Sequence, residues 1–189
     1  MEIEPILKIV SLAVGVVGGL IAGFKAVSEM KLNRMQRERE HRWKQTGEAK
    51  AFLAAIKNDY KSSSALYMLD WSGRHYNISN DEKAAVLFED VDNGLRVEDL
   101  QFSKKEGFIR DCFDDLYEKF GLIEHFIRHG FIEFADVEAP LAYYVKKIVN
   151  NEHHIRFINE YGYHLALGFI TRFNRNNHVT EHARPPQPM

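Results

Sequence analysis

Residues 103–130, SKKEGFIRDCFDDLYEKFGLIEHFIRHG, contain the clearest helical pattern of the chain. Ser103, followed three residues later by Glu106, has the sequence of a capping box, which marks the start of a helix. Apolar residues then recur on one helical face up to Gly130, a residue type that suits a helix end. These residues are Ile109, Cys112, Phe113, Leu116, Phe120, Ile123 and Ile127. The stretch predicts a long amphipathic helix whose apolar face faces a core.

Further helical patterns lie on both sides of this stretch. They predict four more helices, over 48–71, 81–90, 138–149 and about 152–173. Residues 72–79, with Gly73 near their start, are expected to form a loop. No stretch alternates apolar and polar residues convincingly enough to predict a strand. We therefore predict an all-α cytosolic domain, a four- to five-helix bundle over 46–173, followed by a flexible tail over 174–189.

The most apolar segment lies near the N-terminus, where residues 9–24 read IVSLAVGVVGGLIAGF and contain no charge. Extended back to Pro5, with Lys8 reaching outward, it spans ~30 Å as a helix, the thickness of a bilayer core. A cleaved signal peptide would need a basic start, whereas residues 1–4 are Met-Glu-Ile-Glu. We therefore predict a transmembrane helix within residues 1–24.

The next segment, residues 25–45, has the composition of a basic helical stalk that continues the membrane helix. Its first twenty residues include seven basic and three acidic side chains. Because basic residues accumulate on the cytoplasmic side, we expect a single-pass membrane protein with a cytoplasmic C-terminal domain. The side chains expected to contact membrane lipid or another polyanion, such as RNA, are Lys25, Arg34, Arg37, Arg39 and Arg42.

Small residues recur every four positions in the apolar segment and therefore share one stripe of the predicted helix. They are Ser11, Gly15, Gly19 and Gly23. Small residues let membrane helices approach closely, so the stripe predicts a homo-oligomer, with rings of more than two helices permitted. The alternative is that the glycines reflect only the general abundance of glycine in membrane helices.

Composition excludes several kinds of chemistry. A single cysteine, Cys112, rules out an intrachain disulfide framework and a zinc site with several cysteines. The formal net charge of −2 rules out a globally basic nucleic-acid binder. No P-loop, dinucleotide fingerprint or metalloprotease motif is present, and we predict no cofactor.

Several histidines and acidic residues of the helical domain are explained by surface positions on helices. His125 and His129 share a helix face, but a metal would need a further ligand, and the polar flank of a helix explains them without a metal. The pair His153-His154 is expected at the surface of a helix start. Four acidic residues are expected to form a solvated outer face: Asp111, Asp114, Asp115 and Glu118.

Short Arg/His patterns occur at the end of the last predicted helix. A class of small helical ribonuclease domains in prokaryotic defence uses an Arg followed, after four to six residues, by a His. The Arg would stabilise a phosphate and the His would act as acid or base on the 2′-hydroxyl. Arg172 with His178 and Arg175 with His182 fit this spacing, and so does Arg34 with His41 in the stalk. Composition alone predicts ~1.7 matches, so the four candidate catalytic residues rest mainly on their position.

The outline of the chain resembles the small membrane accessory proteins encoded beside the RNA-guided, RNA-cleaving effector of type VI CRISPR systems. The resemblance rests on the N-terminal membrane helix, the basic stalk and a helical domain with Arg/His pairs at its end. Residues 113–132 are also similar to a segment of an uncharacterised bacterial family of membrane-anchored helical proteins. The resemblance implies a divergent ribonuclease-like domain and ring-like membrane pores that assist antiviral defence.

Three functions follow as alternatives. The first is a self-assembling inner-membrane protein that perturbs the membrane in CRISPR-linked antiviral defence. The second is a membrane-tethered, metal-independent ribonuclease that uses a C-terminal Arg/His pair. The third is a non-catalytic module that docks a protein partner, such as an RNA-guided effector, at the membrane.

Overall fold

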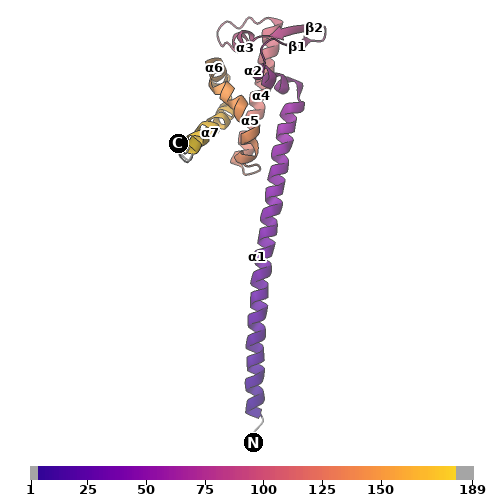
Figure 1. Ribbon diagram of the computed structural model, residues 1–189, viewed down its shortest axis with the longest axis vertical. Helices are drawn as coiled ribbons and strands as arrows, with labels where there is room; N and C mark the ends of the chain where they lie inside the picture. The colour runs from indigo at the N-terminus through magenta and orange to yellow at the C-terminus, as the bar shows by residue number, and fades with distance from the viewer. Residues whose placement is uncertain (1–3, 182–189) are drawn as a thin grey trace, which may run out of the picture. The chain divides into compact units, whose positions relative to one another are not determined.

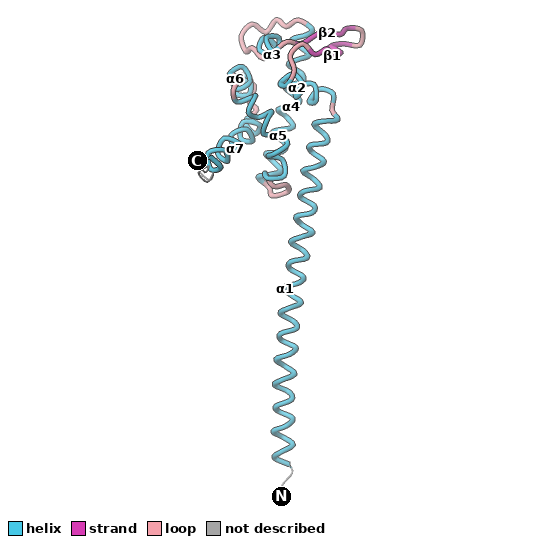
Figure 2. Tube along the Cα trace, viewed as in Figure 1, coloured by secondary structure: helices cyan, strands magenta, loops and turns pink. Residues whose placement is uncertain are grey.

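The computed structural model describes the backbone of residues 4–181 and the side chains of residues 24–173 (Figure 1). Within the described backbone the chain is mostly helical, with seven helices and one antiparallel hairpin (Figure 2). The helices are α1 (Glu4–Asn58), α2 (Tyr60–Asp70), α3 (Phe88–Gly94), α4 (Lys104–Arg128), α5 (Phe134–Val149), α6 (Glu152–Glu160) and α7 (His164–Glu181). The strands are β1 (Arg74–Ser79) and β2 (Glu82–Val86). The chain divides into two compact units after Lys44.

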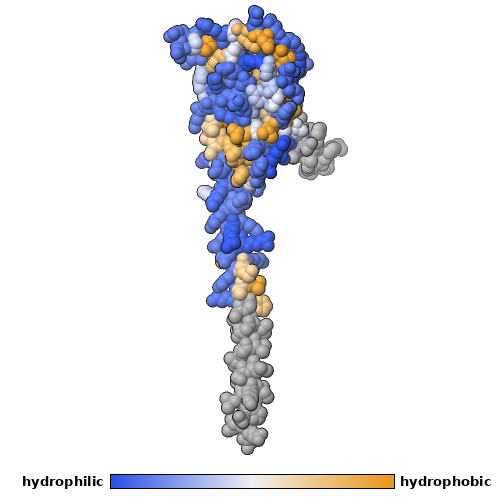
Figure 3. Space-filling model, turned by 180° about the vertical axis from the view of Figure 1, so that it is seen from behind, coloured by the Kyte–Doolittle hydropathy of each residue, from blue (hydrophilic) through white to orange (hydrophobic). Residues whose placement is uncertain are grey.

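The described side chains of the first unit, residues 24–44, are exposed, apart from Arg42, which is half-buried. Six large apolar side chains are among the exposed ones: Phe24, Val27, Met30, Leu32, Met35 and Trp43. Figure 3 shows apolar atoms gathered next to the grey ones and hydrophilic atoms along the rest of this helical stretch. An ion pair between Arg34 and Glu38, one helical turn apart at 2.9 Å, is a purely local contact.

The predicted transmembrane helix, residues 1–24, falls almost entirely on positions whose side chains lie outside the described residues. The backbone from Glu4 onward belongs to α1. From Phe24 to Phe173, where side chains are described, no helix combines the length and the apolar character needed to cross a bilayer. The membrane helix of residues 1–24 therefore stays a prediction.

In the second unit, α4 packs against α2, α3 and α7. It begins with the predicted capping box, in which the Ser103 hydroxyl accepts from the Glu106 N–H and the Glu106 carboxylate accepts from the Ser103 N–H. It ends at Arg128, and Gly130 follows with a φ of 71°, which glycine adopts without strain. The predicted core face is confirmed. Its members Ile109, Cys112, Phe113, Leu116, Phe120 and Ile123 are fully buried, and Ile127 is half-buried.

Aromatic rings fill the core around α4. The ring of Phe120 lies 5.2 Å from that of Phe169 in α7, and the ring of Tyr117 lies 6.1 Å from that of Phe157 in α6. Cys112 is fully buried as well, and burial raises the pKa of its thiol to about 12. The core therefore contains a thiol that stays protonated in the folded chain.

The all-α prediction is wrong at residues 74–86. There the structure has the hairpin β1–β2 in place of a loop and the start of a helix, and α3 follows it. Ser79 pairs with Glu82, so Asn80 and Asp81 make the two-residue turn, for which these residue types are suited. Within the two strands only Tyr76 and Val86 are buried, so an alternating pattern hardly shows in the sequence.

Two predicted helices are each divided in two. The helix predicted over 48–71 is broken at Asp59, whose carboxylate accepts a hydrogen bond of 2.8 Å from the Ser62 N–H and so caps α2. The helix predicted over 152–173 is broken after α6, where Gly162 has a φ of 74°. The first break comes from a side-chain cap at Asp59 and the second from the backbone angle at Gly162. In both places the helical spacing of apolar residues in the sequence gives no sign of the break.

Other helix ends differ from the predicted positions. α5 begins at Phe134, four residues before the expected start, and it contains Pro140. α7 continues beyond Phe173 as far as Glu181. Of the predicted tail, residues 182–189 lie outside the described residues. After α1, the described part of the chain has six helices, α2 to α7, whereas four or five were expected for the whole bundle.

Candidate functional site

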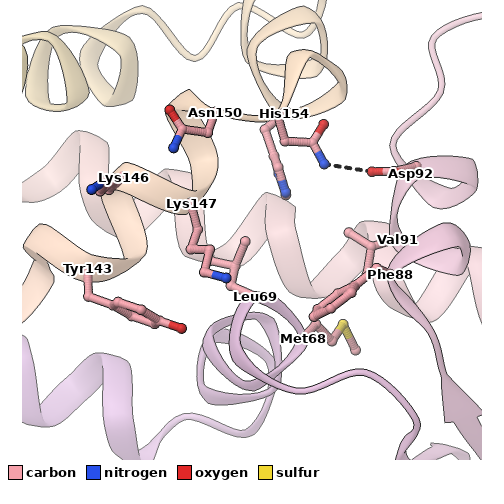
Figure 4. Close-up of a pocket in the computed structure, with 11 residues that line it drawn as sticks. Met68, Leu69, Phe88, Val91, Asp92, Tyr143, Lys146, Lys147, Asn150 and His154 are labelled. Atoms are coloured by element: carbon pink, nitrogen blue, oxygen red, sulfur yellow. Dashed lines mark hydrogen bonds between the residues drawn. The ribbon is translucent and has the colours of Figure 1, made fainter.

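A pocket of about 600 Å³ lies within the second unit, between α2, α3, α5 and α6 (Figure 4). Its apolar wall comes from α2 and α3, and its polar wall comes mainly from α5 and from the start of α6. The apolar wall contains Met68, Leu69, Phe88 and Val91. The polar lining contains Asp92, Tyr143, Lys146, Lys147, Asn150, Asn151 and His154.

His154 is the most perturbed side chain of this pocket. It is 1% exposed, and burial, with a smaller effect of His153, lowers the pKa of its imidazole to about 3. The ring is therefore neutral at physiological pH and carries one N–H. The oxygen of the Tyr117 hydroxyl, a group whose pKa burial raises, lies 2.6 Å from His154 Nδ1. Because this hydroxyl has no other acceptor among the described residues, we assign it as the donor and Nδ1 as the acceptor. The ring proton is then on Nε2.

Acidic groups near the pocket already have polar partners. Asp92 accepts a hydrogen bond of 2.7 Å from the Asn151 amide, and Asp70 accepts one of 2.6 Å from the Tyr143 hydroxyl. Lys146 and Lys147 are exposed and form no ion pair with any described residue. None of these four charged groups has an ion-pair partner among the described residues. The residues that line the pocket include two cations, Lys146 and Lys147, and one carboxylate, Asp92, so the lining carries a net positive charge.

The burial of His154 corrects the prediction that it lies at the surface. A signal for it is present in the sequence, because His154, Phe157 and Ile158 have the i, i+3, i+4 spacing of one helix face, and all three are buried in α6. A histidine at the first of these positions takes its place in the core when a partner such as Tyr117 satisfies one ring nitrogen.

Arg172, the first predicted catalytic residue, is held by a buried carboxylate. Glu124 of α4, whose side chain is 2% exposed, accepts hydrogen bonds from Arg172 Nε at 2.6 Å and Nη2 at 3.0 Å, and from Arg128 Nε at 2.8 Å. Burial alone would raise the pKa of Glu124, but the two arginines outweigh it and lower that pKa. Arg172 thus ties α7 to α4, and a phosphate would have to displace Glu124 to bind the same two N–H groups.

The remaining predicted site residues lie in three places. The side chains of Arg175, His178 and His182 are outside the described residues, so no predicted Arg/His pair is brought together by the described part. The stripe Ser11, Gly15, Gly19 and Gly23 is also outside the described side chains. The predicted polyanion contacts Lys25, Arg34, Arg37 and Arg39 are exposed on α1, and Arg42 is half-buried.

His125 and His129 lie side by side on α4, with ring centroids 4.2 Å apart. His129 Nδ1 is 2.8 Å from the carbonyl oxygen of His125, so one of its two ring nitrogens is engaged by the backbone. Among the described residues, no group of three or more side chains is placed to hold a metal ion.

Two of the four acidic residues predicted on a solvated face are half-buried and have partners. Asp115 accepts from the Ser62 hydroxyl and from Lys119, whose Nζ is 2.6 Å away. Asp114 accepts a hydrogen bond of 2.6 Å from the Tyr163 hydroxyl, and burial raises the pKa of its carboxyl. The prediction is wrong for this pair because α2 and the segment before α7 cover that side of α4. The spacing along α4 alone contains no sign of these covering segments.

Known proteins give no independent indication of what this chain does. No family model, no curated protein and no solved structure matches this chain. Two features then stand out as candidates for function. They are the pocket around His154 and the exposed, basic stretch of α1.

Proposed function

We propose that the chain is a self-assembling, single-pass protein of the bacterial inner membrane, with the helical domain in the cytoplasm. The observation that carries this proposal is the exposure of residues 24–44 of α1. This stretch directly follows the uncharged sequence from Ile9 to Phe24. It combines exposed apolar side chains, such as Phe24 at 79% and Met30 at 71%, with a surplus of basic ones.

A helical stretch whose side chains are mostly exposed gains little from the tertiary packing that stabilises most protein helices. Its described side chains make local pairs, such as Arg34 with Glu38, which contribute only ~0.3–0.5 kcal/mol each. Lipid around the preceding apolar segment, and basic side chains beside anionic head groups, would supply the missing stabilisation. Contacts with the same stretch of other copies would cover its apolar side chains.

Assembly through the stripe Ser11, Gly15, Gly19 and Gly23 is part of the proposal. Close approach of backbones at small residues drives association in lipid, where apolar burial gives no advantage. The resemblance to type VI CRISPR accessory proteins extends the proposal to a ring that perturbs the membrane during antiviral defence.

A substitution in the stripe tests the assembly. In the variant Gly15→Leu/Gly19→Leu the added side chains keep helices apart, and we expect the mass of the detergent-solubilised particle to fall to that of one chain. The matched control is Val14→Leu/Val17→Leu, which adds apolar bulk on the other side of the predicted helix. Equal masses for the wild type and the stripe variant would refute assembly through these glycines.

Limited proteolysis tests the membrane topology. Trypsin cleaves after basic residues, and those of residues 25–44 are exposed apart from Arg42, which is half-buried. We expect cleavage there in inside-out inner-membrane vesicles and protection in spheroplasts. The opposite result would reverse the orientation, and recovery of the chain in the fraction without membranes would overturn the anchor itself.

A further inference from the structure

The pocket around His154 has no role in the function proposed above. We propose that it binds a small amphipathic anion, with an apolar body and one carboxylate or phosphate group. Three independent properties of its lining support this assignment: an apolar wall, a neutral N–H donor and a net positive charge.

The apolar wall defines the body of the ligand. Met68, Leu69 and Val91 line the cavity although each is at most 6% exposed, so they form a rigid inner surface. Phe88 is 47% exposed and offers an aromatic ring to a ligand that enters the cavity. A volume of about 600 Å³ lies within the usual range of small-molecule pockets, roughly 300–1,000 Å³.

The donor on His154 defines the first polar contact. Figure 4 shows the His154 ring extending from α6 toward the side of the pocket where Leu69 lies. Since Nδ1 accepts from Tyr117, the Nε2–H is the ring's remaining polar group. A donor among apolar side chains is best satisfied by an acceptor oxygen of the ligand. The Tyr117 contact also fixes the tautomer, so the ring remains a donor.

The lysines define the sign of the ligand's charge. Lys146 and Lys147 stand one helical turn or less from Tyr143 and Asn150 on α5, and neither forms an ion pair with a described residue. The two acidic groups on this side, Asp92 and Asp70, are occupied by Asn151 and by Tyr143. An anionic group meets two cations against the single carboxylate of the lining, Asp92, whereas a cationic ligand meets the opposite balance of charge.

Four naphthalene probes of one shape but different charge test this assignment on the full chain in lipid nanodiscs. They are 2-naphthoate, 2-naphthyl phosphate, uncharged 2-naphthol and the cation 2-naphthylmethylammonium. Equilibrium dialysis against each probe, with empty nanodiscs subtracted, gives the dissociation constants. We expect one saturable site per chain for the anions, with affinity at least ~10-fold above those of naphthol and the cation. The two anionic arms tell a carboxylate site from a phosphate site.

A charge-neutralised variant locates the site. Lys146→Gln/Lys147→Gln should weaken binding of the anions ~10-fold and leave that of naphthol unchanged. The control Lys50→Gln/Lys57→Gln removes the same charge from exposed positions of α1 and should leave all four constants unchanged. Equal losses of anion affinity in the two variants would show that the net charge of the chain is responsible, and the proposed anion site would then be refuted.

Nuclear magnetic resonance of histidine ring nitrogens gives a readout that needs no variant. Saturation with the better anion should shift the Nε2–H signal of His154 and leave those of the exposed His125 and His129 in place. An unmoved His154 signal at saturation would overturn the proposal, as would naphthol binding as tightly as the anions.

Discussion

Residues 24–44 of α1 and the whole of α4 are helical stretches of similar length, but different interactions stabilise them. In α4 a capping box sets the start, and a continuous face of buried side chains packs against neighbouring helices. In the α1 stretch the described side chains are exposed apart from the half-buried Arg42, and the ion pair of Arg34 joins it to Glu38, one helical turn away. The comparison teaches that a helix gains most of its stability from packing, which α4 has and which the exposed side chains of residues 24–44 largely lack.

The largest effect that tests this comparison comes from truncation in α4. Phe120→Ala leaves a cavity among the rings next to Phe169, and we expect the free energy of unfolding of the second unit to fall by ~3–5 kcal/mol. Met30→Ala truncates an exposed side chain of α1 and should change the free energy of unfolding by less than ~0.5 kcal/mol. Hydrogen exchange of the core amides measures both. Similar losses of unfolding free energy in the two variants would show that packing stabilises residues 24–44 as much as it stabilises α4.

An intermediate effect follows from the buried neutral histidine. Because the folded pKa of His154 is about 3, below the ordinary 6.5, the unfolded chain binds more protons between these values. The free energy of unfolding should therefore fall as the pH drops below about 6.5, by up to ~1.4 kcal/mol per pH unit, until about pH 3. Chemical denaturation at pH 7, 6 and 5 measures the slope.

Two variants identify the group responsible for that slope. Tyr117→Phe/His154→Leu removes both partners of the hydrogen bond, so no polar atom is left buried alone, and the contribution of His154 should disappear. His41→Gln removes an exposed histidine of the α1 stretch and should leave the slope unchanged. A slope that persists in the double variant would assign the acid sensitivity to other groups.

A smaller effect concerns the predicted catalytic arginine. Arg172→Gln removes two hydrogen bonds from Glu124 but leaves that of Arg128, and Arg172 is 38% exposed, so we expect a loss of ~1 kcal/mol after solvent screening. Arg156→Gln, which removes an ion pair with the exposed Glu98, should leave the free energy of unfolding nearly unchanged because water screens the pair. Thermal or chemical unfolding compares the two.

RNA cleavage by the same proteins tests the ribonuclease alternative. If Arg172 binds phosphate, Arg172→Gln should abolish cleavage and Arg156→Gln should not. Cleavage at the wild-type rate by a variant with Arg172, Arg175, His178 and His182 all changed to Ala would exclude an Arg/His site at this end of the chain.

The smallest effect tests the α1 stretch itself. Glu38→Gln breaks the pair with Arg34 and should reduce local helix stability by ~0.3–0.5 kcal/mol, with the difference vanishing at high salt. Glu40→Gln changes the same charge and should have a smaller effect, since Glu40 forms no ion pair with any residue whose side chain is described. Hydrogen exchange of residues 34–42 reports the change, and a loss of several kcal/mol would show that this stretch has a tertiary partner.

The parts of the fold that were predictable are those with strong local signals. The capping box at Ser103 and Glu106, the core face of α4 and the helix end near Gly130 each depend on a few neighbouring residues, and the structure confirms them. The hairpin was not predictable because its strands bury only Tyr76 and Val86. Tyr76 packs toward Phe108 of α4, a contact between segments far apart in the sequence.

The candidate site was less predictable than the fold. The pocket joins α2, α3, α5 and α6, and no short motif spans elements so far apart. Arg172 was found by its spacing to a histidine, whereas its observed partner is Glu124, which lies on another helix. Side-chain partners of this kind depend on which helices pack together, and a period along one helix contains no such information.

Burial of Cys112 has a consequence for the redox chemistry of the chain. Oxidants and alkylating reagents attack the thiolate, which a buried thiol with a pKa near 12 scarcely forms. The folded domain is therefore insensitive to oxidative conditions that modify exposed thiols. Its lone sulfhydryl reacts when the core opens, so the rate of its modification records how often that opening occurs.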